Sequence, residues 1–434
     1  MHKYKKALIL GAGRSGRAAE ALLRGEGATV LTICQEQTPD YNFEELHFDP
    51  EVVIMSPGFS LEHPWVKDLT ARGIPLLSEL ELGWSRRHCP VIAVTGSNGK
   101  STVVKWIADA LTQAGQVAVP CGNYGLPLSA AVMLPEVPDW LVVEVSSFQL
   151  ETVQEFHPQI GVLLNVLPNH LDRHGDLETY LRTKLRLFEN MTGSDTAVVF
   201  QGLEKYFPNL GKESCAPTQS VPKVGKISFG TEAGADFRFV DGKVGAVDLS
   251  GTYFDNEVLG AAAAAVAAVG EACGLSPSVL ESSARSFEPL PHRMQTVAEI
   301  GGVRFVDDSK ATNLAAMCAA LRMSGGRVHL IAGGRPKESN FSFAKDLLAQ
   351  QVSRLYLIGE ASTAMQSAWE DCAECIPCQT LERAVLSAWE HAEPGDTVLL
   401  SPACTSFDQF CSFAERGDVF AREVNRLADS DAKA

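Results

Sequence analysis

The 434-residue sequence lacks any apolar stretch long enough to form a membrane-spanning helix. Its longest run of small apolar residues, around Ala261–Val269, falls far short of the ~18 residues that such a helix needs. The N-terminus carries basic residues but leads directly into a glycine-rich turn, without the apolar core of a cleavable signal peptide. We therefore expect a cytoplasmic protein that is not bound to a membrane.

Basic clusters are also missing, and the formal net charge of −16 argues against a nucleic-acid partner. The eleven cysteines are odd in number and scattered, which favours a reducing compartment over a disulfide framework. Cys372, Cys375 and Cys378 are closely spaced, but no nearby pair of Cys or His residues would complete a zinc site. We predict an ordinary structural segment there.

The most informative segment present is VIAVTGSNGKST, residues 91–102. Val91–Thr95 predicts a buried strand, and the residues from Val103 to Ala114 predict a helix. A glycine loop between a strand and a helix binds nucleoside triphosphates, because backbone N–H groups can approach the phosphate oxygens at the positive end of the helix. The loop departs from the usual pattern, since Val94 stands where the first glycine of GxxxxGK[ST] belongs.

The candidate ATP-binding residues of this loop are Gly96, Ser97, Asn98, Gly99, Lys100, Ser101 and Thr102. Lys100 would reach the outer phosphates, and the hydroxyl of Ser101 or Thr102 could ligate Mg²⁺. Glu144 ends an apolar predicted strand close by, where a carboxylate is suited to hold Mg²⁺ and would be costly to bury alone. A strand-end acid in a hydrogen-bond network is the alternative.

A second glycine pattern, GAGRSG at residues 11–16, has the GxGxxG spacing of a dinucleotide fingerprint. An NAD site also needs an acidic residue after the second strand, but Cys34 stands there. The loop is therefore predicted to hold another diphosphate. Ser56, Pro57 and Gly58 follow the third predicted strand, where open sheets gather ligand contacts.

The chain length suggests about three domains. Strands alternate with helices throughout, which predicts an α/β fold with mainly parallel sheets. We expect a Rossmann-like N-terminal domain (residues 1–88), a central P-loop ATPase domain (89–290) and a C-terminal Rossmann-like α/β domain (291–434). Besides the P-loop strand, strands are predicted at Ala7–Leu10, Thr29–Ile33, Val52–Met55, Trp140–Val145, Ile160–Asn165, Val303–Val306, Val328–Ala332, Arg354–Ile358 and Thr397–Leu400. Helical sequence is predicted at Phe148–Phe156 and Gly260–Ala272, and a connection at Leu76–Pro90.

Two further groups of candidate residues remain ambiguous from the residues alone. His170, in a loop, could contact metal or phosphate or be structural, and Lys184, on a predicted helix, would ordinarily be solvated. In the third domain the polar segments FVDDSKATN, IAGGRPKESNF and LLSPACTSFDQF each follow a strand. Their cations suit an anionic ligand such as a carboxylate, although every α/β domain has surface loops of this kind.

Eight motifs occur together and in order along essentially the whole chain: TGSNGKST, SSFQLE, NHLDRHG, YxxxKLRLFEN, LPHR, DDSKATN, GGRPK and LSPACTSFDQFxxFxxRG. The sequence resembles the Mur ligase family, and DSKATN with SPACTSFDQF resembles the members that add D-glutamate. The resemblance implies an ATP-dependent, peptidoglycan-forming ligase that acts on UDP-N-acetylmuramoyl-L-alanine and D-glutamate through an acyl phosphate. It also implies two Mg²⁺ ions, and we expect a monomer.

The resemblance assigns roles to individual residues. Ser101 or Thr102 and Glu144 match ligands of the ATP-bound Mg²⁺, whereas His170 and Lys184 match those of a second Mg²⁺, with Lys184 carbamylated. Asn123 matches a residue near the reacting carboxylate, and Asn256, Arg293 and Asp308 match nucleotide contacts. The UDP-facing loops would contain Arg14, Ser15, Ser56, Pro57 and Gly58. The D-glutamate pocket would contain Thr312, Lys337, Ser406 and Phe413, with Lys310 close by.

The sequence departs from the family pattern at two places. Leu259 replaces the second asparagine of an HNxxN motif, of which Asn256 remains, and this puts the contacts to adenine in doubt. Cys34 replaces an acid that often contacts uracil, so Gln35 or Glu36 would have to supply that contact. Three alternatives stay open: a ligase for another amino acid, a nucleotide-binding regulator without catalysis, and an NAD oxidoreductase, which Cys34 disfavours.

Overall fold

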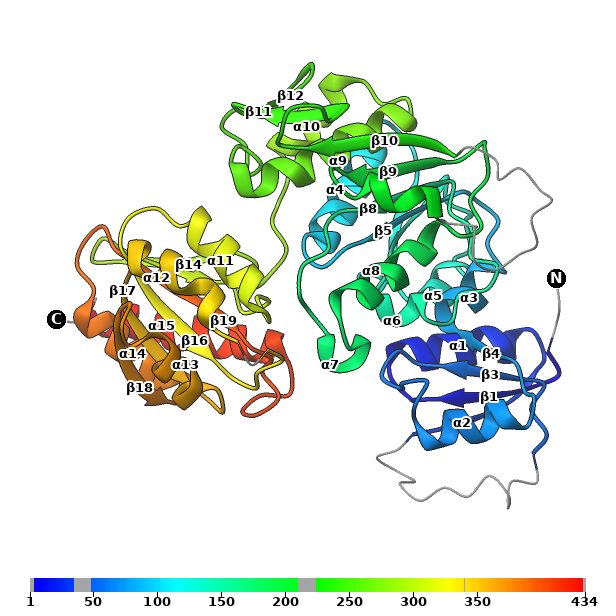
Figure 1. The fold of residues 1–434 in the computed structure, drawn as a ribbon, viewed down its shortest axis with the longest axis horizontal. Helices are drawn as coiled ribbons and strands as arrows, with labels where there is room; N and C mark the ends of the chain where they lie inside the picture. Colours follow the sequence, from blue (N-terminus) through cyan, green and yellow to red (C-terminus); the bar gives the residue numbers. More distant parts are fainter. Residues whose placement is uncertain (1–3, 35–47, 210–223, 339, 432–434) are drawn as a thin grey trace. The chain divides into compact units, whose positions relative to one another are not determined.

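The structure is a computed structural model that describes residues 4–34, 48–209, 224–338 and 340–431 (Figure 1). It divides into two compact units, each described separately. Unit 1 contains residues 1–166 and 175–287, and unit 2 contains residues 167–174 and 288–434. Three sheets with helices on both faces confirm the α/β class, whereas the domain boundaries at residues 88 and 290 stay a prediction.

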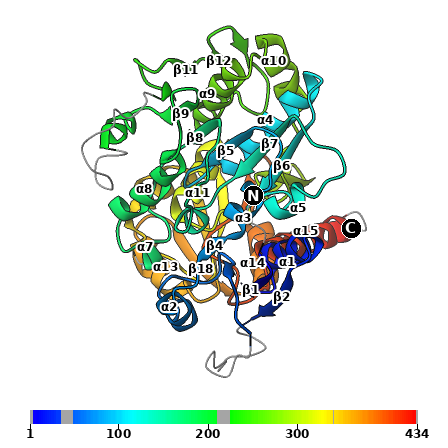
Figure 2. The ribbon, with the colours of Figure 1, turned by 90° about the vertical axis from the view of Figure 1, so that its right-hand side faces the viewer.

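The first sheet of unit 1 is a parallel sheet with the strand order β2-β1-β3-β4. Helices α1 and α2 cover opposite faces of this sheet (Figures 1 and 2). Alternating residues of β1 face opposite sides, so Ala7 and Ile9 pack with α1 while Leu8 and Leu10 pack with α2. The predicted connection at Leu76–Pro90 was wrong, because it contains β4 and α3. The elements are β1 (Lys6–Leu10), α1 (Arg14–Gly25), β2 (Thr29–Ile33), β3 (Val52–Met55), α2 (Pro64–Ala71), β4 (Leu76–Ser78) and α3 (Glu79–Trp84).

The second sheet of unit 1 has the order β13-β12-β11-β10-β9-β8-β5-β7-β6. Every pairing is parallel except β11 with β12 and β12 with β13, which confirms the mainly parallel prediction. Its strands are β5 (Val91–Thr95), β6 (Ala118–Gly122), β7 (Trp140–Glu144), β8 (Ile160–Leu163), β9 (Thr196–Phe200), β10 (Gly225–Gly230), β11 (Phe237–Val240), β12 (Lys243–Val244) and β13 (Val247–Asp248). Since β5 lies between β7 and β8, the loops that follow these three strands meet at one edge.

Helices cover both faces of this sheet. One face packs against α4, α9 and α10, and the other against α3, α5, α6 and α8. The bounds are α4 (Lys100–Gln113), α5 (Leu128–Ala131), α6 (Ser147–Leu150), α8 (Leu177–Leu185), η2 (Arg186–Phe188), η3 (Glu204–Asn209), α9 (Glu257–Ala272) and α10 (Pro277–Arg285). The small residues of α9 let it approach the sheet closely, and Gly260 lies against the ring of Phe239.

The predicted helix at Phe148–Phe156 was wrong, because α6 ends at Leu150. Side chains satisfy the backbone groups beyond that point in place of helical hydrogen bonds. The guanidinium of Arg186 donates to the carbonyl oxygens of Leu150, Glu151 and Val153. The carboxylate of Glu81 accepts the next three amides, at residues 154–156. Two charged side chains therefore make the backbone hydrogen bonds that a continued helix would have made.

Unit 2 is built on a six-stranded sheet with the order β14-β15-β19-β16-β17-β18, in which only β14 runs antiparallel to its neighbour. The four predicted strands are confirmed, but β14 and β18 were missed. Its strands are β14 (Gln295–Ile300), β15 (Val303–Asp307), β16 (Val328–Gly333), β17 (Val352–Ile358), β18 (Glu374–Gln379) and β19 (Thr397–Ala403). Its helices are α7 (Leu171–His174), α11 (Leu314–Met323), η4 (Ser342–Ala344), α12 (Lys345–Gln351), α13 (Ser362–Trp369), α14 (Leu381–His391) and α15 (Phe413–Asp431).

Strand β18 explains the closely spaced cysteines, since Cys375 and Cys378 lie on this edge strand. Within the described residues, no cluster of three or more His, Cys, Asp or Glu side chains could hold a metal ion. Likewise, no helix of the described ranges is long and apolar enough to cross a membrane.

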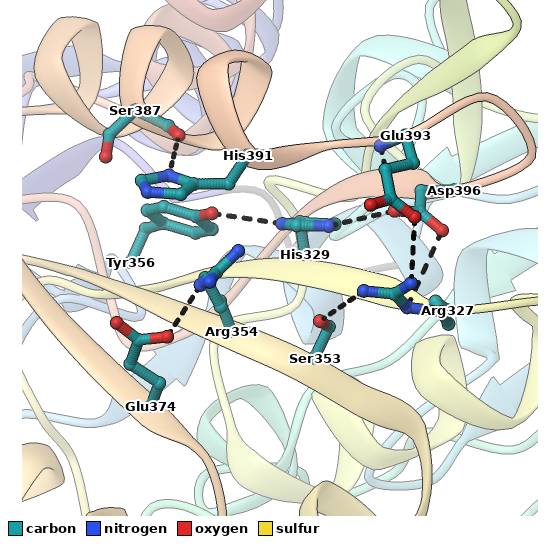
Figure 3. Close-up of polar contacts among 10 residues, drawn as sticks. All are labelled: Arg327, His329, Ser353, Arg354, Tyr356, Glu374, Ser387, His391, Glu393 and Asp396. Atoms are coloured by element: carbon teal, nitrogen blue, oxygen red, sulfur yellow. Dashed lines mark hydrogen bonds and ion pairs between the residues drawn. The ribbon is translucent and has the colours of Figure 1, made fainter.

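A buried polar network lies where the strands of unit 2 begin (Figure 3). His329, near the start of β16, is fully buried. One ring nitrogen, Nδ1, hydrogen-bonds to the Tyr356 hydroxyl (3.0 Å), and Nε2 to the carboxylate of Asp396 (3.1 Å). Burial lowers the pKa of His329, and the nearby Asp396 opposes that shift. The network lies at the opposite end of β16 from the predicted ligand loops.

Candidate active site

The loop between β5 and α4 has the backbone shape of a phosphate cradle. Gly96 (φ 154°) and Gly99 (φ 85°) adopt positive φ angles, and Gly99 is the N-cap of α4. A side chain at residue 96 would lie only 2.9 Å from Leu164. Glycine is therefore favoured at positions 96 and 99. The backbone of this loop opens onto the N-terminus of α4.

Asn165, which follows β8, shapes the same loop. Its side-chain oxygen accepts the backbone amides of Ser97 (3.1 Å) and Asn98 (2.9 Å), and its side-chain nitrogen donates to the Asn98 carbonyl (3.1 Å). The sequence analysis did not single out Asn165 as a functional residue. Its place after a strand that neighbours the P-loop strand is the signal that could have found it.

Lys100 begins α4 and turns back over the loop. Its ammonium group donates to the carbonyl oxygens of Gly96 (2.8 Å) and Ser97 (2.9 Å). The side chain is partly buried, so the cation stays at the cradle rather than in bulk solvent. This position fits the predicted contact with the outer phosphates.

Glu144 ends β7 beside the cradle and is 2% exposed. Its Oε2 accepts the hydroxyl of Ser101 (2.6 Å), and its Oε1 accepts the amide of Asn123 (2.5 Å). Asn123 follows β6, whose last residue pairs with Glu144 in the sheet. The structure thus brings these three predicted residues together, and Thr102 is buried one residue along α4.

Lys184 lies on α8 and is 1% exposed, so the ordinary expectation of a solvated helix residue was wrong. Its ammonium group donates to the Gly96 carbonyl (2.9 Å) and lies 4.3 Å from the centre of the Tyr180 ring. Burial lowers the pKa of Lys184 well below its usual range, the nearby charge of Lys100 lowers it further, and Glu144 raises it. Burial therefore favours the neutral form of this amine.

His170 lies in the segment 167–174, which groups with unit 2, whereas Lys184 belongs to unit 1. Its backbone adopts a positive φ of 56°, unusual for a residue other than glycine. The shared metal site of His170 and Lys184 stays a prediction.

The predicted UDP-facing loops follow β1 and β3, which are neighbours in the first sheet. The Ser56 hydroxyl donates to the Gly11 carbonyl (3.4 Å), and Pro57 and Gly58 continue that loop. Arg14, which with Ser15 begins α1, donates to the carbonyl of Gly125 (2.8 Å). Cys34 is buried, and the predicted contacts at Gln35 and Glu36 lie outside the described residues.

Asn256 serves as the N-cap of α9. Its side-chain oxygen accepts the amide of Leu259 (2.9 Å), and its nitrogen donates to the Tyr253 carbonyl (3.0 Å). Leu259 packs partly buried against the hydrophobic core. The asparagine thus has a local structural role, and its contact with ATP stays a prediction.

In unit 2, Asp308 follows β15 and is 8% exposed. Its carboxyl group accepts the Ser401 hydroxyl (2.9 Å) and the backbone amide of Met294 (3.2 Å). Burial raises the pKa of Asp308 to about 7, against the lowering effects of these hydrogen bonds and of the Arg293 charge. The two predicted nucleotide contacts of this unit therefore interact electrostatically.

The predicted D-glutamate residues lie on three loops of unit 2. Lys310 lies 3.8 Å above the Phe413 ring, and Thr312 follows in the same loop. The loops of Lys337 and Ser406 are joined by two backbone hydrogen bonds between Arg335 and Thr405 (2.9 and 3.0 Å). These loops follow β16 and β19, which are adjacent. The grouping at the carboxyl ends of the strands is as the sequence predicted.

Arg416, on α15, belongs to the RG pair of the last motif, but the sequence analysis assigned it no role. It is fully buried and donates to the hydroxyl and carbonyl of Ser309 (3.0 and 2.8 Å) and to the Cys404 carbonyl (3.0 Å). Burial lowers its pKa to about 10. The arginine joins α15 to the loops after β15 and β19, and the RG pair that follows SPACTSFDQF is the signal that could have found it.

Comparison with known proteins agrees with this geometry. The chain is 33% identical to the UDP-N-acetylmuramoylalanine--D-glutamate ligase of Koribacter versatilis, with 99% of each chain covered. It is 36% identical to the enzyme of that name from Syntrophotalea carbinolica, with 98% of each covered. The chain belongs to the Mur ligase family. The family models for the Mur ligase middle domain and the Mur ligase glutamate ligase domain match residues 94–256 and 292–404 of this Mur ligase.

Solved structures share the Mur ligase fold. The UDP-N-acetylmuramate-alanine ligase MurC of Thermotoga maritima gives a TM-score of 0.60 at 15% identity, covering 98% of this chain and 100% of that one. The MurF ligase of the same organism, solved in complex with ADP, gives 0.60 at 18% identity, covering 91% and 92%. At these identities the likeness concerns the fold alone.

Proposed function

We propose that this Mur ligase joins D-glutamate to UDP-N-acetylmuramoyl-L-alanine at the expense of ATP, a cytoplasmic step of peptidoglycan synthesis. The similarity to D-glutamate ligases over nearly the full length supports the substrates. The observation that carries the chemistry is the meeting of Lys100, Glu144 and Lys184 at one phosphate cradle.

The reaction needs activation because a carboxylate is a poor electrophile. A carboxylate oxygen of the substrate attacks the γ-phosphorus of ATP, ADP leaves, and an acyl phosphate forms. The amine of D-glutamate then attacks the acyl carbon, loses a proton, and expels inorganic phosphate to leave the amide. Lys100, held at the cradle, is placed to stabilise negative charge on the phosphoryl group during its transfer.

The residues beside the cradle fit a magnesium ion. Ser101 Oγ and Glu144 Oε2 lie 2.6 Å apart, and both are the oxygen ligands that Mg²⁺ prefers. Bound there, Mg²⁺ would neutralise charge on the phosphates during transfer. The Asn123 amide holds the other carboxylate oxygen and thereby orients Glu144.

Lys184 fits a carbamylated lysine. A neutral amine can add CO₂ and release a proton to give a carbamate, and burial beside Lys100 favours the neutral amine. The carbamate would change the side chain from a cation into an anionic oxygen ligand. With His170, it would hold the second Mg²⁺.

The remaining predicted residues complete the proposal. The loops of Arg14, Ser15 and Ser56–Gly58 would bind the UDP moiety, and Asn256, Arg293 and Asp308 the adenine nucleotide. The pocket of Thr312, Lys337, Ser406 and Phe413, with Lys310, would bind D-glutamate. In this proposal the three regions correspond to domains at residues 1–88, 89–290 and 291–434 of a monomer.

Phosphate release tests the proposal. The purified protein is incubated with Mg²⁺, ATP, UDP-N-acetylmuramoyl-L-alanine and each member of a panel of D- and L-amino acids. We expect release with D-glutamate and not with L-glutamate. Release with another amino acid alone would make the chain a ligase of different specificity, and Mg-ATP binding without release would make it a regulator. Mixtures lacking the UDP substrate control for background hydrolysis.

A further inference from the structure

Arg293 lies between two strained residues at the start of unit 2. His292 and Met294 have φ angles of 59° and 46°, in the left-handed region that side-chain-bearing residues rarely adopt. The chain passes into this unit at residue 288, so the strain lies close to the junction between the units. A strained backbone persists only where its surroundings over-determine it, and such sites cluster at functional positions.

Contacts with the last residue of β15 and with the loop that follows it hold this backbone. The His292 Nδ1 atom lies 2.7 Å from Asp307 Oδ2, and the His292 carbonyl accepts the amide of Lys310 (3.1 Å). The amide of Met294 donates to Asp308 (3.2 Å). The strained residues are therefore tied to the beginning of the DDSKATN loop at three points.

The His292–Asp307 pair is itself firmly fixed. Asp307 is 1% exposed, and its other oxygen, Oδ1, accepts the amide of Ser309 (2.8 Å). Helix α15 packs directly on the pair at Gly417, where a Cβ atom would lie 2.1 Å from His292 Nδ1 and 2.6 Å from Asp307 Oδ2. The glycine lets the helix approach the pair closely, and a hydrogen bond between a ring and a carboxylate is strong because it is charge-assisted.

We propose that His292 and Asp307 are positioning residues for nucleotide binding, an inference that rests on the proposed function. The pair fixes the backbone on both sides of Arg293 and ties it to the loop of Asp308. The pair thereby holds Arg293 and Asp308, the two predicted nucleotide contacts of this unit, in a fixed position relative to each other. Neither His292 nor Asp307 is assigned a contact with the nucleotide itself.

Two substitutions of His292 separate this role from a general effect on folding. In His292→Asn the amide nitrogen lies near the position of Nδ1, and asparagine tolerates positive φ. In His292→Gln the amide lies near the position of Nε2, so the bond to Asp307 is lost. His391→Gln, at the other end of the unit's strands, is the matched control. Asp307→Asn removes the carboxylate that bonds to His292 and so tests the pair at its other residue.

The measurements are the dissociation constant of ADP with Mg²⁺ by calorimetry, the KM values for ATP and D-glutamate, and the melting temperature. We expect His292→Gln to raise the ADP dissociation constant about tenfold, as for a lost charge-assisted hydrogen bond, with the KM for D-glutamate unchanged. The ADP dissociation constant of His292→Asn should be close to that of the wild type. That of Asp307→Asn should rise, as it does in His292→Gln.

Three outcomes would overturn the inference. The first is an ADP affinity of His292→Gln equal to that of the wild type. The second is an equal loss of ADP affinity in His292→Asn and His292→Gln. The third is a parallel loss of ADP affinity, D-glutamate affinity and melting temperature in His292→Gln. If His292→Gln does not fold, Asp307→Asn and His292→Asn decide the question through the same constants. A wild type that binds ADP but fails to use D-glutamate refutes the proposed function, while the comparison of ADP affinities still tests the pair.

Discussion

Lys100 and Lys184 share a single hydrogen-bond acceptor. Both ammonium groups donate to the carbonyl oxygen of Gly96, at 2.8 and 2.9 Å, although one lysine begins α4 and the other lies on α8. Two cations on one oxygen repel each other, and Lys184, which is buried, has its pKa lowered. The cradle therefore favours an anion beside Lys100 and a neutral or modified amine at Lys184.

Lys100→Ala should abolish turnover without unfolding the protein. Removal of the cation proposed to stabilise the transferring phosphoryl group should lower kcat by at least about 10²–10³-fold. Lys105→Ala, on the same helix in a pair with Asp109, is the matched control and should be nearly neutral. Phosphate release gives the rates, and near-normal turnover in Lys100→Ala would remove the residue from the mechanism.

Lys184→Ala should lose activity that a small carboxylic acid partly restores. A carbamate at this position acts through its anionic oxygens, so acetate or formate in the vacated space can replace it. The wild type should also lose activity in CO₂-depleted buffer and recover with bicarbonate. Arg182→Ala, an exposed neighbour on α8, serves as the control. Full activity of Lys184→Ala in CO₂-free buffer would contradict the assignment of the second metal.

Lys337→Ala should weaken the use of D-glutamate far more than the use of ATP. Loss of a cation proposed to pair with a substrate carboxylate should raise the KM for D-glutamate by about 10–100-fold. Lys345→Ala, whose side chain pairs with Asp371 on the same unit, is the control. Equal changes in both KM values would place Lys337 outside the pocket.

Asp308→Asn should change how the stability of the protein depends on pH. Burial raises the pKa of Asp308 from the usual 3.8 to about 7, so folding favours the protonated form. That contribution is fully present below about pH 4 and is lost as the pH rises through 7. The free energy of unfolding should therefore shift in favour of the asparagine variant between pH 4 and pH 8, by up to about 4 kcal/mol.

Denaturant unfolding of both proteins at several pH values measures this difference. Asparagine keeps an acceptor for the Met294 amide and remains beside the Ser401 hydroxyl, so the comparison isolates the titration. A difference in stability that stays constant with pH would show that Asp308 does not titrate in this range.

Much of the fold could be predicted because its signals are local. The strand Val91–Thr95 is an apolar run before a glycine loop, and its predicted bounds agree with β5. Strands β4 and β18 were missed because the former has three residues and the latter lies on a sheet edge, with a weak apolar pattern. The end of α6 depends on Arg186 and Glu81, which are distant in sequence and invisible to local patterns.

In the site, too, features with local sequence signals could be predicted, and features that depend on residues distant in sequence could not. The meeting of Lys100, Ser101 and Glu144 could be predicted since they lie at the carboxyl ends of adjacent strands in recognisable motifs. The environment of Lys184 could not, because it arises from the packing of α8 on the P-loop, 88 residues away in sequence. Likewise, the RG pair points to Arg416, but the burial of Arg416 depends on the loops after β15 and β19, and Arg422 on the same helix is exposed.

The buried hydrogen-bonded chain Tyr356–His329–Asp396 makes the stability of unit 2 depend on pH at a place away from its polar loops. Because burial lowers the pKa of His329, the unfolded chain takes up a proton at a pH at which the folded protein does not, so the fold loses stability as the pH falls below the ordinary pKa of histidine. This histidine lies where the strands begin, and the polar loops lie where they end. Substitutions at His329 should therefore change the acid sensitivity of this unit without touching the polar loops.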